Sequence, residues 1–303
     1  MSDRYEFIDA ECAEYRHVDR GRVPSIVQMC SWLGVSRSGF YEWRTTPESA
    51  TTARREGLAL YIRKSFDDSG GTYGHRRVAS DLADWGVAAG PELVRSIMRE
   101  LGLEACQPKP WRHSLTAGDG QEHDIPDLVE RDFTADAPGE KMVGDITYIP
   151  TWEGWTYLAT VIDCYSKKIV GWAIDDNYKT PLIENAIEMA ARNCSLAPNA
   201  IFHSDRGSNY TSSQFAATLN KLNIRQSVGR TGICYDNALA ESFNAALKNE
   251  RVHRTQYPTR RHARRDVVRY IEFWYNLRRK HSGLQYKSPQ QAHDAYMQTQ
   301  LTA

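Results

Sequence analysis

The spacing of apolar positions near the start of the chain predicts two consecutive helices. Apolar residues at helical spacing over Ile26–Cys30 are followed by Gly34, which can end a helix. Ser36 is a suitable N-cap for a second helix that carries Phe40 and Trp43. Two helices joined by a glycine-containing turn are typical of a helix-turn-helix motif that binds DNA. The same pattern is also typical of a helical hairpin that packs against the rest of the protein without binding DNA. We favour the DNA-binding motif.

A break rich in Thr, Pro and Ser separates this first module, residues 1–50, from a second one over residues 51–108. Apolar positions in the second module recur at helical spacing in three stretches. The last stretch begins at Pro91 and stops at Gly102, which are a favoured helix start and a favoured helix end. This pattern predicts a winged or three-helix module that contributes to DNA binding.

Residues 109–139 combine prolines, glycines and a run of acidic residues, a composition typical of a linker. After the linker the period of the apolar positions changes from that of helices to that of strands. A catalytic core is therefore predicted over residues 140–279, followed by a C-terminal tail, residues 280–303.

Three β-rich stretches open this core, and their short connections predict an antiparallel meander. Helices and strands then alternate, with helices at 181–192 and 214–222, short strands at 200–203 and 224–228, and a last helix that carries Glu241. The predicted fold class is α+β or mixed α/β, a mixed five-stranded sheet with helices packed on it. That order of elements is similar to ribonuclease-H-like folds, here preceded by the helix-turn-helix-type modules.

The composition is that of an ordinary globular protein of 303 residues, 41% hydrophobic and 25% charged. Six scattered cysteines without a C-x-x-C pair argue against a zinc knuckle or a disulfide framework and suit a reducing compartment. No apolar window is long enough to span a bilayer, and the first residues are too charged for a signal peptide. We expect a bacterial cytoplasmic protein, associated with the nucleoid when bound to DNA.

The formal net charge is zero, but the charge is segregated along the chain. Between Arg251 and His281 ten Arg or Lys residues stand against two acids, Asp266 and Glu272. Such a block indicates either a surface for a polyanion or a solvated helix face.

Three acids are placed where a metal site for phosphoryl transfer would need them. Asp145 lies within the first predicted strand, Asp205 just past a later strand, and Glu241 inside a helix. Magnesium prefers oxygen ligands, and two divalent ions roughly 3.5–4 Å apart can stabilise both the attacking and the leaving oxygen of an in-line displacement. Asp163 is a fourth candidate acid, with a turn cap as the alternative interpretation, and Asp236 is interpreted as a helix N-cap.

The helix of the third acid has a polar face. Asn237, Glu241, Asn244 and Lys248 recur at intervals of four, three and four residues, so they share one side of the helix. A polar face alone is more often plain surface. Beside a metal site, however, Lys248 could contact a DNA phosphate.

Four motifs, in this order and at these separations, resemble the DDE transposases of insertion-sequence family three. They are Gly144–Ile149, His203–Tyr210, Asp236–Lys248 and Tyr275–Pro289. Two positions near them depart from the family pattern, Asn209 in place of Gln and Met142 in place of an aromatic residue. Neither is a triad position, so they bear on local packing or DNA contact rather than on catalysis.

The resemblance implies that Asp145, Asp205 and Glu241 are the catalytic and metal-binding triad and that Lys248 is its following basic residue. It implies two Mg²⁺ ions, with Mn²⁺ as a substitute, for cleavage at the terminal inverted repeats and strand transfer by the freed 3′-hydroxyl. It also implies a copy-out, paste-in route and an upstream reading frame that carries a helix-turn-helix and a leucine zipper, often fused to this one. This chain has no long heptad run, so two alternatives stay open: the catalytic half of a larger transposase, or a member that works alone.

We expect DNA of the element ends and of the target as partners, and at least a dimer, because two ends must be joined at one site. The residues predicted to contact DNA are Lys248, Asn237, Asn244, Arg206, Arg37, Arg76, Arg77, Arg261, Arg265, Arg278 and Arg279.

Two other functions fit parts of the pattern. A retrovirus-like or phage-like integrase would use the same core, although this chain has no N-terminal His-His…Cys-Cys zinc pattern. A regulator that binds element ends without catalysis would need only the helical modules. Metal-dependent DNA cleavage separates the regulator from both enzymes.

Overall fold

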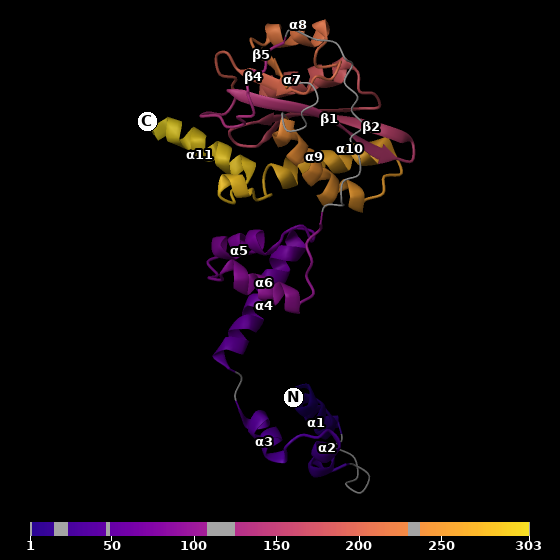
Figure 1. The fold of residues 1–303 in the computed structure, drawn as a ribbon, viewed down its shortest axis with the longest axis vertical. Coiled ribbons are helices and arrows are strands. Elements are labelled where there is room, and N and C mark those ends of the chain that lie inside the picture. The colour runs from indigo at the N-terminus through magenta and orange to yellow at the C-terminus, as the bar shows by residue number, and fades with distance from the viewer. Residues whose placement is uncertain (1, 15–23, 47–48, 108–124, 230–236, 303) are drawn as a thin grey trace.

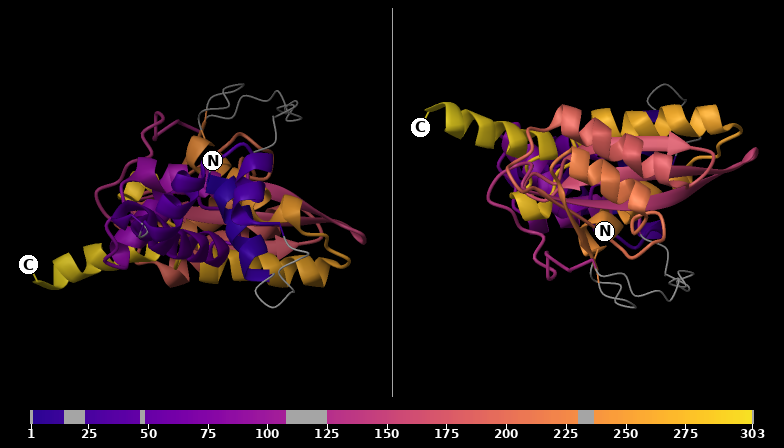
Figure 2. Two further views of the ribbon diagram at one scale, coloured as in Figure 1. Left: turned by 90° about the horizontal axis from the view of Figure 1, so that it is seen from below. Right: turned by 90° about the horizontal axis from the view of Figure 1, so that it is seen from above.

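The computed structural model describes residues 2–14, 24–46, 49–107, 125–229 and 237–302. Figure 1 shows three bodies in a row, with the N-terminal helices at one end, a second helical body in the middle and the sheet at the other end. In both views of Figure 2 the C-terminal helix projects away from the rest of the chain.

The first body consists of α1 (Ser2–Glu14), α2 (Ile26–Trp32) and α3 (Arg37–Thr45). The Ser36 hydroxyl accepts the Gly39 N–H, which caps α3 as predicted, and Gly34 has a positive φ of 62° just after α2. The helix–turn–helix arrangement is therefore present. Its small core is made by Tyr5, Ile8, Met29, Cys30 and Phe40.

The second body is formed by α4 (Ala50–Asp68), α5 (His75–Asp84) and α6 (Pro91–Glu100). Leu82 and Val94 are fully buried between these helices. No strand pairs within residues 49–107, so the second module has three helices and no wing in the part that the structure describes.

The third body is a five-stranded sheet of order β3-β2-β1-β4-β5. Strands β1 (Lys141–Thr151), β2 (Gly154–Asp163) and β3 (Ile169–Asp175) form the predicted antiparallel meander, while β4 (Ile201–Ser204) and β5 (Arg225–Val228) run parallel to β1. Parallel neighbours need crossover connections, which the intervening helices supply.

Helices cover both faces of the sheet (Figure 1). On one face lie α7 (Thr180–Asn193) and α8 (Ser213–Lys221), packed on Met142, Phe202 and their neighbours. The other face is covered by α9 (Ala238–Glu250), the short η3 (Val252–Arg254), α10 (Arg260–Arg269) and the π-helix η4 (Tyr270–Tyr275). This mixed sheet between helical layers is the predicted fold class.

Two segments differ from their predicted roles. Residues 108–124 of the predicted linker lie outside the described residues, but 125–139 pack along the sheet. There the Pro126 carbonyl accepts the Val228 N–H, the Leu128 N–H donates to Ser227, and Val129 is 3% exposed. These residues belong to the core because they complete the edge at β5.

The predicted tail also has structure, since η5 (Ser282–Leu284) leads into α11 (Pro289–Thr302). Tyr296 of α11 packs edge-on against Tyr165 of the core, with 5.1 Å between ring centroids.

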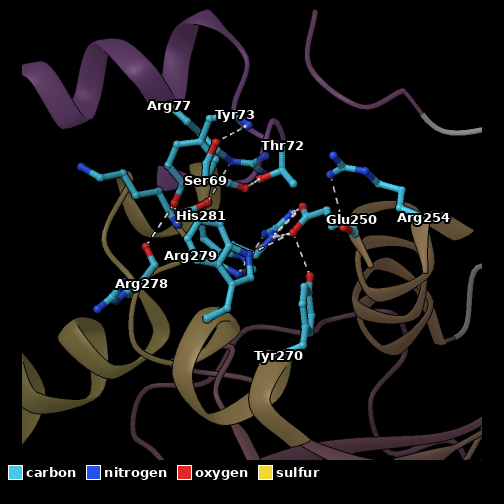
Figure 3. Close-up of polar contacts among 12 residues, drawn as sticks. Ser69, Thr72, Tyr73, Arg77, Glu250, Arg254, Tyr270, Arg278, Arg279 and His281 are labelled. Atoms are coloured by element: carbon cyan, nitrogen blue, oxygen red, sulfur yellow. Dashed lines mark hydrogen bonds and ion pairs between the residues drawn. The ribbon is translucent and has the colours of Figure 1, made fainter. Parts of the chain in front are cut away.

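The second and third bodies are joined by polar contacts (Figure 3). The Tyr73 hydroxyl donates to the Arg278 carbonyl and accepts the Lys280 N–H, at 3.1 and 2.8 Å. The Lys280 ammonium donates to Ser80 and pairs with Asp84 on α5.

None of the helices in the described residues is long and apolar enough to cross a membrane.

Candidate active site

The first acid, Asp145, is held from two sides. It lies on β1, and its Oδ1 accepts the Ile146 N–H at 2.8 Å. Its Oδ2 accepts the side-chain amide of Asn244 on α9 at 2.7 Å. At the N-cap of α9, the Asn237 amide donates to the Gly144 carbonyl at 3.0 Å. Two hydrogen bonds therefore fix α9 against the strand that carries Asp145.

The second acid, Asp205, comes next to Asp145 through the register of the sheet. Strands β1 and β4 are parallel neighbours in which Val143 pairs with His203, and each aspartate follows two residues later. The Gly207 N–H donates to Asp205 Oδ1 at 3.1 Å, which orients the carboxylate in its loop. Two adjacent parallel strands thus present both aspartates at one edge.

The third acid, Glu241, is exposed on the first turn of α9, just after a segment outside the described residues that includes Asp236. Burial and the Asp205 charge both raise its pKa. Burial raises the pKa of Asp145 to about 7, helped by the charge of Asp205 and less by that of Glu241. The pKa of Asp205 is raised as well, chiefly by burial. The three carboxylates therefore form one negatively charged cluster that disfavours its own ionisation.

This cluster fits divalent cations chemically. Its donors are carboxylate oxygens, the ligands that Mg²⁺ prefers, and a cation would favour the ionised forms that burial, and for Asp145 and Glu241 also the Asp205 charge, disfavour. Two buried amide oxygens beside it, Oδ1 of Asn237 and of Asn244, have no hydrogen-bond partner. Among the described residues no three His, Cys, Asp or Glu side chains are already placed to hold a metal ion. Glu241 would therefore have to turn toward the two aspartates for all three to share ions.

Lys248 lies two turns beyond Glu241 on α9. Its ammonium sits 4.5 Å from the ring centroid of Tyr148, a residue of β1 that is 48% exposed. Burial lowers the pKa of Lys248, while the nearby Asp145 charge opposes this shift. A cation is thus positioned at the rim of the carboxylate cluster.

Five of the arginines predicted to contact DNA are exposed and available, namely Arg37, Arg76, Arg261, Arg265 and Arg278. Two others are partly engaged with carbonyl groups. Arg206 donates to the Gly229 carbonyl at 2.7 Å, and Arg77 donates to the Lys280 carbonyl at 3.0 Å.

Three of the predicted DNA contacts have structural roles instead. Arg279 is 7% exposed and forms a bidentate ion pair with Glu250, so its guanidinium is not available to a phosphate. Asn237 and Asn244 are 6% and 7% exposed, and both bind groups of β1. The sequence predicts that these two asparagines share one face of the helix, but it does not show that this face packs on β1.

Asp163 has the predicted capping role and is no fourth ligand. It is fully buried, and its carboxylate accepts the Ser166 N–H at 2.7 Å and the Gly139 N–H at 2.9 Å. Sequence reasoning missed Glu250, because nothing local to it signals the pairing with Arg279, 29 residues away.

Family models match most of the chain. Two models described as integrase core domain match residues 135–234 and 222–289, and one described as HTH-like domain matches residues 53–111. The transposase InsF for insertion sequence IS3A of Escherichia coli is 36% identical over 296 residues, which are 95% of this chain and 97% of the relative. The chain belongs to the IS3-type insertion-sequence transposases. A second relative, the transposase for insertion sequence element IS904 of Lactococcus lactis, is 36% identical over 241 residues, which are 80% of this chain and 95% of the relative.

The solved structures similar to this chain include an intasome chain and an integrase catalytic core. A chain of the simian T-cell lymphotropic virus intasome aligns with 77% of this chain and 74% of its own length, at a TM-score of 0.45 and 15% identity. The HTLV-2 integrase catalytic core domain, in complex with magnesium, aligns with 52% of this chain and 98% of its own length, at a TM-score of 0.40 and 17% identity.

Proposed function

We propose that this transposase cleaves DNA at the terminal inverted repeats of its insertion sequence and joins the freed 3′-hydroxyl to target DNA in a metal-dependent reaction. The observation that carries the proposal is the meeting of Asp145 and Asp205 on adjacent parallel strands, with Glu241 on the helix that packs beside them. The Asp205 charge adds to burial in raising the pKa of both Asp145 and Glu241, so the three carboxyls are electrostatically coupled, which supports a site that a cation would complete.

Asp145, Asp205 and Glu241 would hold two divalent ions, Mg²⁺ or in its place Mn²⁺. When bound, such ions stabilise charge on the attacking and leaving oxygens of an in-line phosphoryl displacement. The protein's part is to position groups. The Asn244 amide and the Ile146 N–H keep the Asp145 carboxylate in one orientation, and the Gly207 N–H does the same for Asp205.

Lys248 would neutralise a phosphate next to the scissile one, because its ammonium lies at the rim of the cluster and is already partly desolvated. The exposed arginines of α3 and α5, Arg37 and Arg76, would contact DNA backbone through the two helical modules.

Joining two element ends at one target requires at least a dimer of this chain. A copy-out, paste-in route, an upstream-frame partner with a helix-turn-helix and a leucine zipper, and action at the nucleoid in the bacterial cytoplasm all belong to this proposal as consequences of the family.

The test is an assay on duplex DNA carrying the element's own end, with Mg²⁺ or with EDTA. We expect a nick that leaves a 3′-hydroxyl at the element boundary, only with the metal. Tight end binding without any metal-dependent nick would contradict the proposal and favour a regulator. When a viral-type end is supplied as a second substrate, a nick confined to that DNA would favour an integrase.

A further inference from the structure

A groove of about 1320 Å³ runs between the three-helix module and the C-terminal half of the core. One wall is the loop from Asp68 to Thr72, between α4 and α5. The opposite wall is formed by the end of α9, by α10 and by η4. Seven arginines line this groove: Arg251, Arg254, Arg261, Arg264, Arg265, Arg269 and Arg278.

The groove has a large excess of positive charge, because its acids are already paired. Asp68 pairs with Lys64, Glu250 with Arg279 and Asp266 with Arg251. Five of the arginine side chains make no hydrogen bond or ion pair with any described residue, and all five are exposed: Arg261, Arg264, Arg265, Arg269 and Arg278. Charges of one sign at this density favour a polyanion.

Aromatic side chains stand among these arginines. Phe273 is 63% exposed in the groove, and Trp274 beside it is partly buried. Both belong to the π-helix η4, in which the Asn276 N–H donates to the Ile271 carbonyl five residues earlier. π-Helical turns are rare in proteins, and those that occur are often found at functional sites. Apolar rings between guanidinium groups suit contact with nucleic acid, where sugars and bases accompany the phosphates.

The groove is connected to the active site through a single helix. Glu241 lies at the start of α9 and Glu250 at its end, nine residues later. At 1.5 Å per residue the groove therefore begins roughly 14 Å from the third carboxylate. That distance corresponds to about four base pairs at 3.4 Å per pair.

The wall of the groove that belongs to the three-helix module is held against the core. Tyr73 and Lys280 join the three-helix module to the core, and the buried Glu250–Arg279 pair lies directly beneath this junction (Figure 3). A duplex in the groove would therefore contact the catalytic core and the HTH-like module at the same time.

We propose that this groove binds the subterminal duplex of the element end, the segment that begins about four base pairs from the cleaved bond. This inference rests on the proposed function, since it takes that bond to lie at Asp145, Asp205 and Glu241. The groove would hold the duplex through its phosphates and so set the distance between the helical module and the catalytic carboxylates.

The test compares two charge-matched triple variants of the full chain. The groove variant carries Arg261→Gln, Arg264→Gln and Arg265→Gln on α10. The control variant carries Lys179→Gln, Arg192→Gln and Lys221→Gln. These residues are exposed and lie at the N-cap of α7, on α7 and on α8, on the opposite face of the sheet. Binding to element-end duplex is measured by fluorescence anisotropy in EDTA over a range of salt, after circular dichroism has confirmed that both variants fold.

The groove variant is expected to bind the element end at least tenfold more weakly at low salt, with a salt slope smaller by about two to three, because each phosphate contact contributes about 0.9 to that slope. The control variant should bind like the wild type. Neutral methylphosphonates placed four or more base pairs from the cleaved bond should weaken wild-type binding and leave the groove variant unaffected.

Equal binding by the groove variant and the wild type would overturn the inference. So would a loss confined to duplex without the element sequence, because the groove would then hold target DNA. The absence of Mg²⁺-dependent nicking by the wild type would refute the proposed function, and is distinguishable because binding is measured without metal.

Discussion

Replacing Asp145 with asparagine should stabilise the metal-free protein at alkaline pH, although it removes a proposed metal ligand. The buried Asp145 carboxyl has its pKa raised from 3.8 to about 7, chiefly by burial and by the charge of Asp205. Because the folded-state pKa lies above the unfolded one, the folded state binds the proton more tightly. The stability that this proton confers is complete below about pH 4 and is lost as the pH rises through about 7.

The magnitude follows from the size of the shift. A pKa change of one corresponds to about 1.36 kcal/mol. The rise in the Asp145 pKa from 3.8 to about 7 therefore lowers the free energy of unfolding by up to about 4 kcal/mol between acidic and alkaline pH. The asparagine amide carries no charge at any pH, so the Asp145→Asn protein lacks this loss. Exposed Glu241 is the matched control, because Glu241→Gln removes a carboxylate of the same cluster whose pKa is less strongly shifted.

The assay is native-state hydrogen exchange of the β1 and β2 amides in EDTA at pH 5 and pH 8, with exchange rates corrected for pH. It reports the opening free energy of the core alone, which matters because the chain has separate helical bodies. We expect the core of the wild type to lose stability between the two pH values and that of Asp145→Asn to keep it. Mg²⁺ should restore the wild type at pH 8. An equally stable wild-type core at both pH values would refute the reasoning.

Three further predictions concern packing and positioning. Gly171→Ala should destabilise the core by about 1–3 kcal/mol in urea unfolding, because a Cβ there would lie 2.1 Å from the Ala186 carbonyl oxygen of α7. Gly57→Ala in α4, where a Cβ would have no atom within 4 Å, should instead stabilise the protein by up to about 1 kcal/mol, and similar effects of the two changes would be inconsistent with this packing. Asn244→Ala should raise the Mg²⁺ concentration needed for half-maximal cleavage at least tenfold and leave end binding in EDTA unchanged, and an unaltered Mg²⁺ titration would show that the amide does not position a ligand. Glu250→Gln leaves a buried arginine without its charge partner and should cost about 3–5 kcal/mol in thermal or urea unfolding, so a loss below about 1 kcal/mol would argue against a buried ion pair.

The antiparallel meander and the mixed five-stranded sheet could be predicted because the period of the apolar positions and the length of the connections indicate them. Short links between three alternating stretches require antiparallel neighbours, and helices before each later strand allow parallel ones. The pairing of β4 with β1, which brings Asp145 and Asp205 together, is seen only in the structure. Glu241 then follows from the polar face of its helix.

The basic block could not be divided into its roles from the sequence. Arg279 and Lys280 look like their neighbour Arg278, yet they are buried against acids that lie far away in the chain, Glu250 and Asp84. The sequence shows how many charged residues lie close together along the chain. It does not show which of them form ion pairs, because those contacts are made only in the folded structure.

Composition also misled for the segment before the sheet. Residues 125–139 are rich in the residue types of linkers, but their backbone groups bond to β5 and Asp163. Pattern reasoning has no term for backbone hydrogen bonds to an edge strand, so a segment without period appears unstructured. The π-helix η4 escaped prediction for a related reason, since it continues the apolar pattern of α10.

The central claim is that three carboxylates form the catalytic centre for DNA joining. Its most direct test is the joining of a pre-cleaved element end to target DNA with Mg²⁺, by the wild type and by Glu241→Gln side by side, with end binding measured in the same samples. We predict equal binding, metal-dependent joining by the wild type and a loss of at least a thousandfold in the variant. Substantial joining by Glu241→Gln at equal binding would contradict the assignment of the centre.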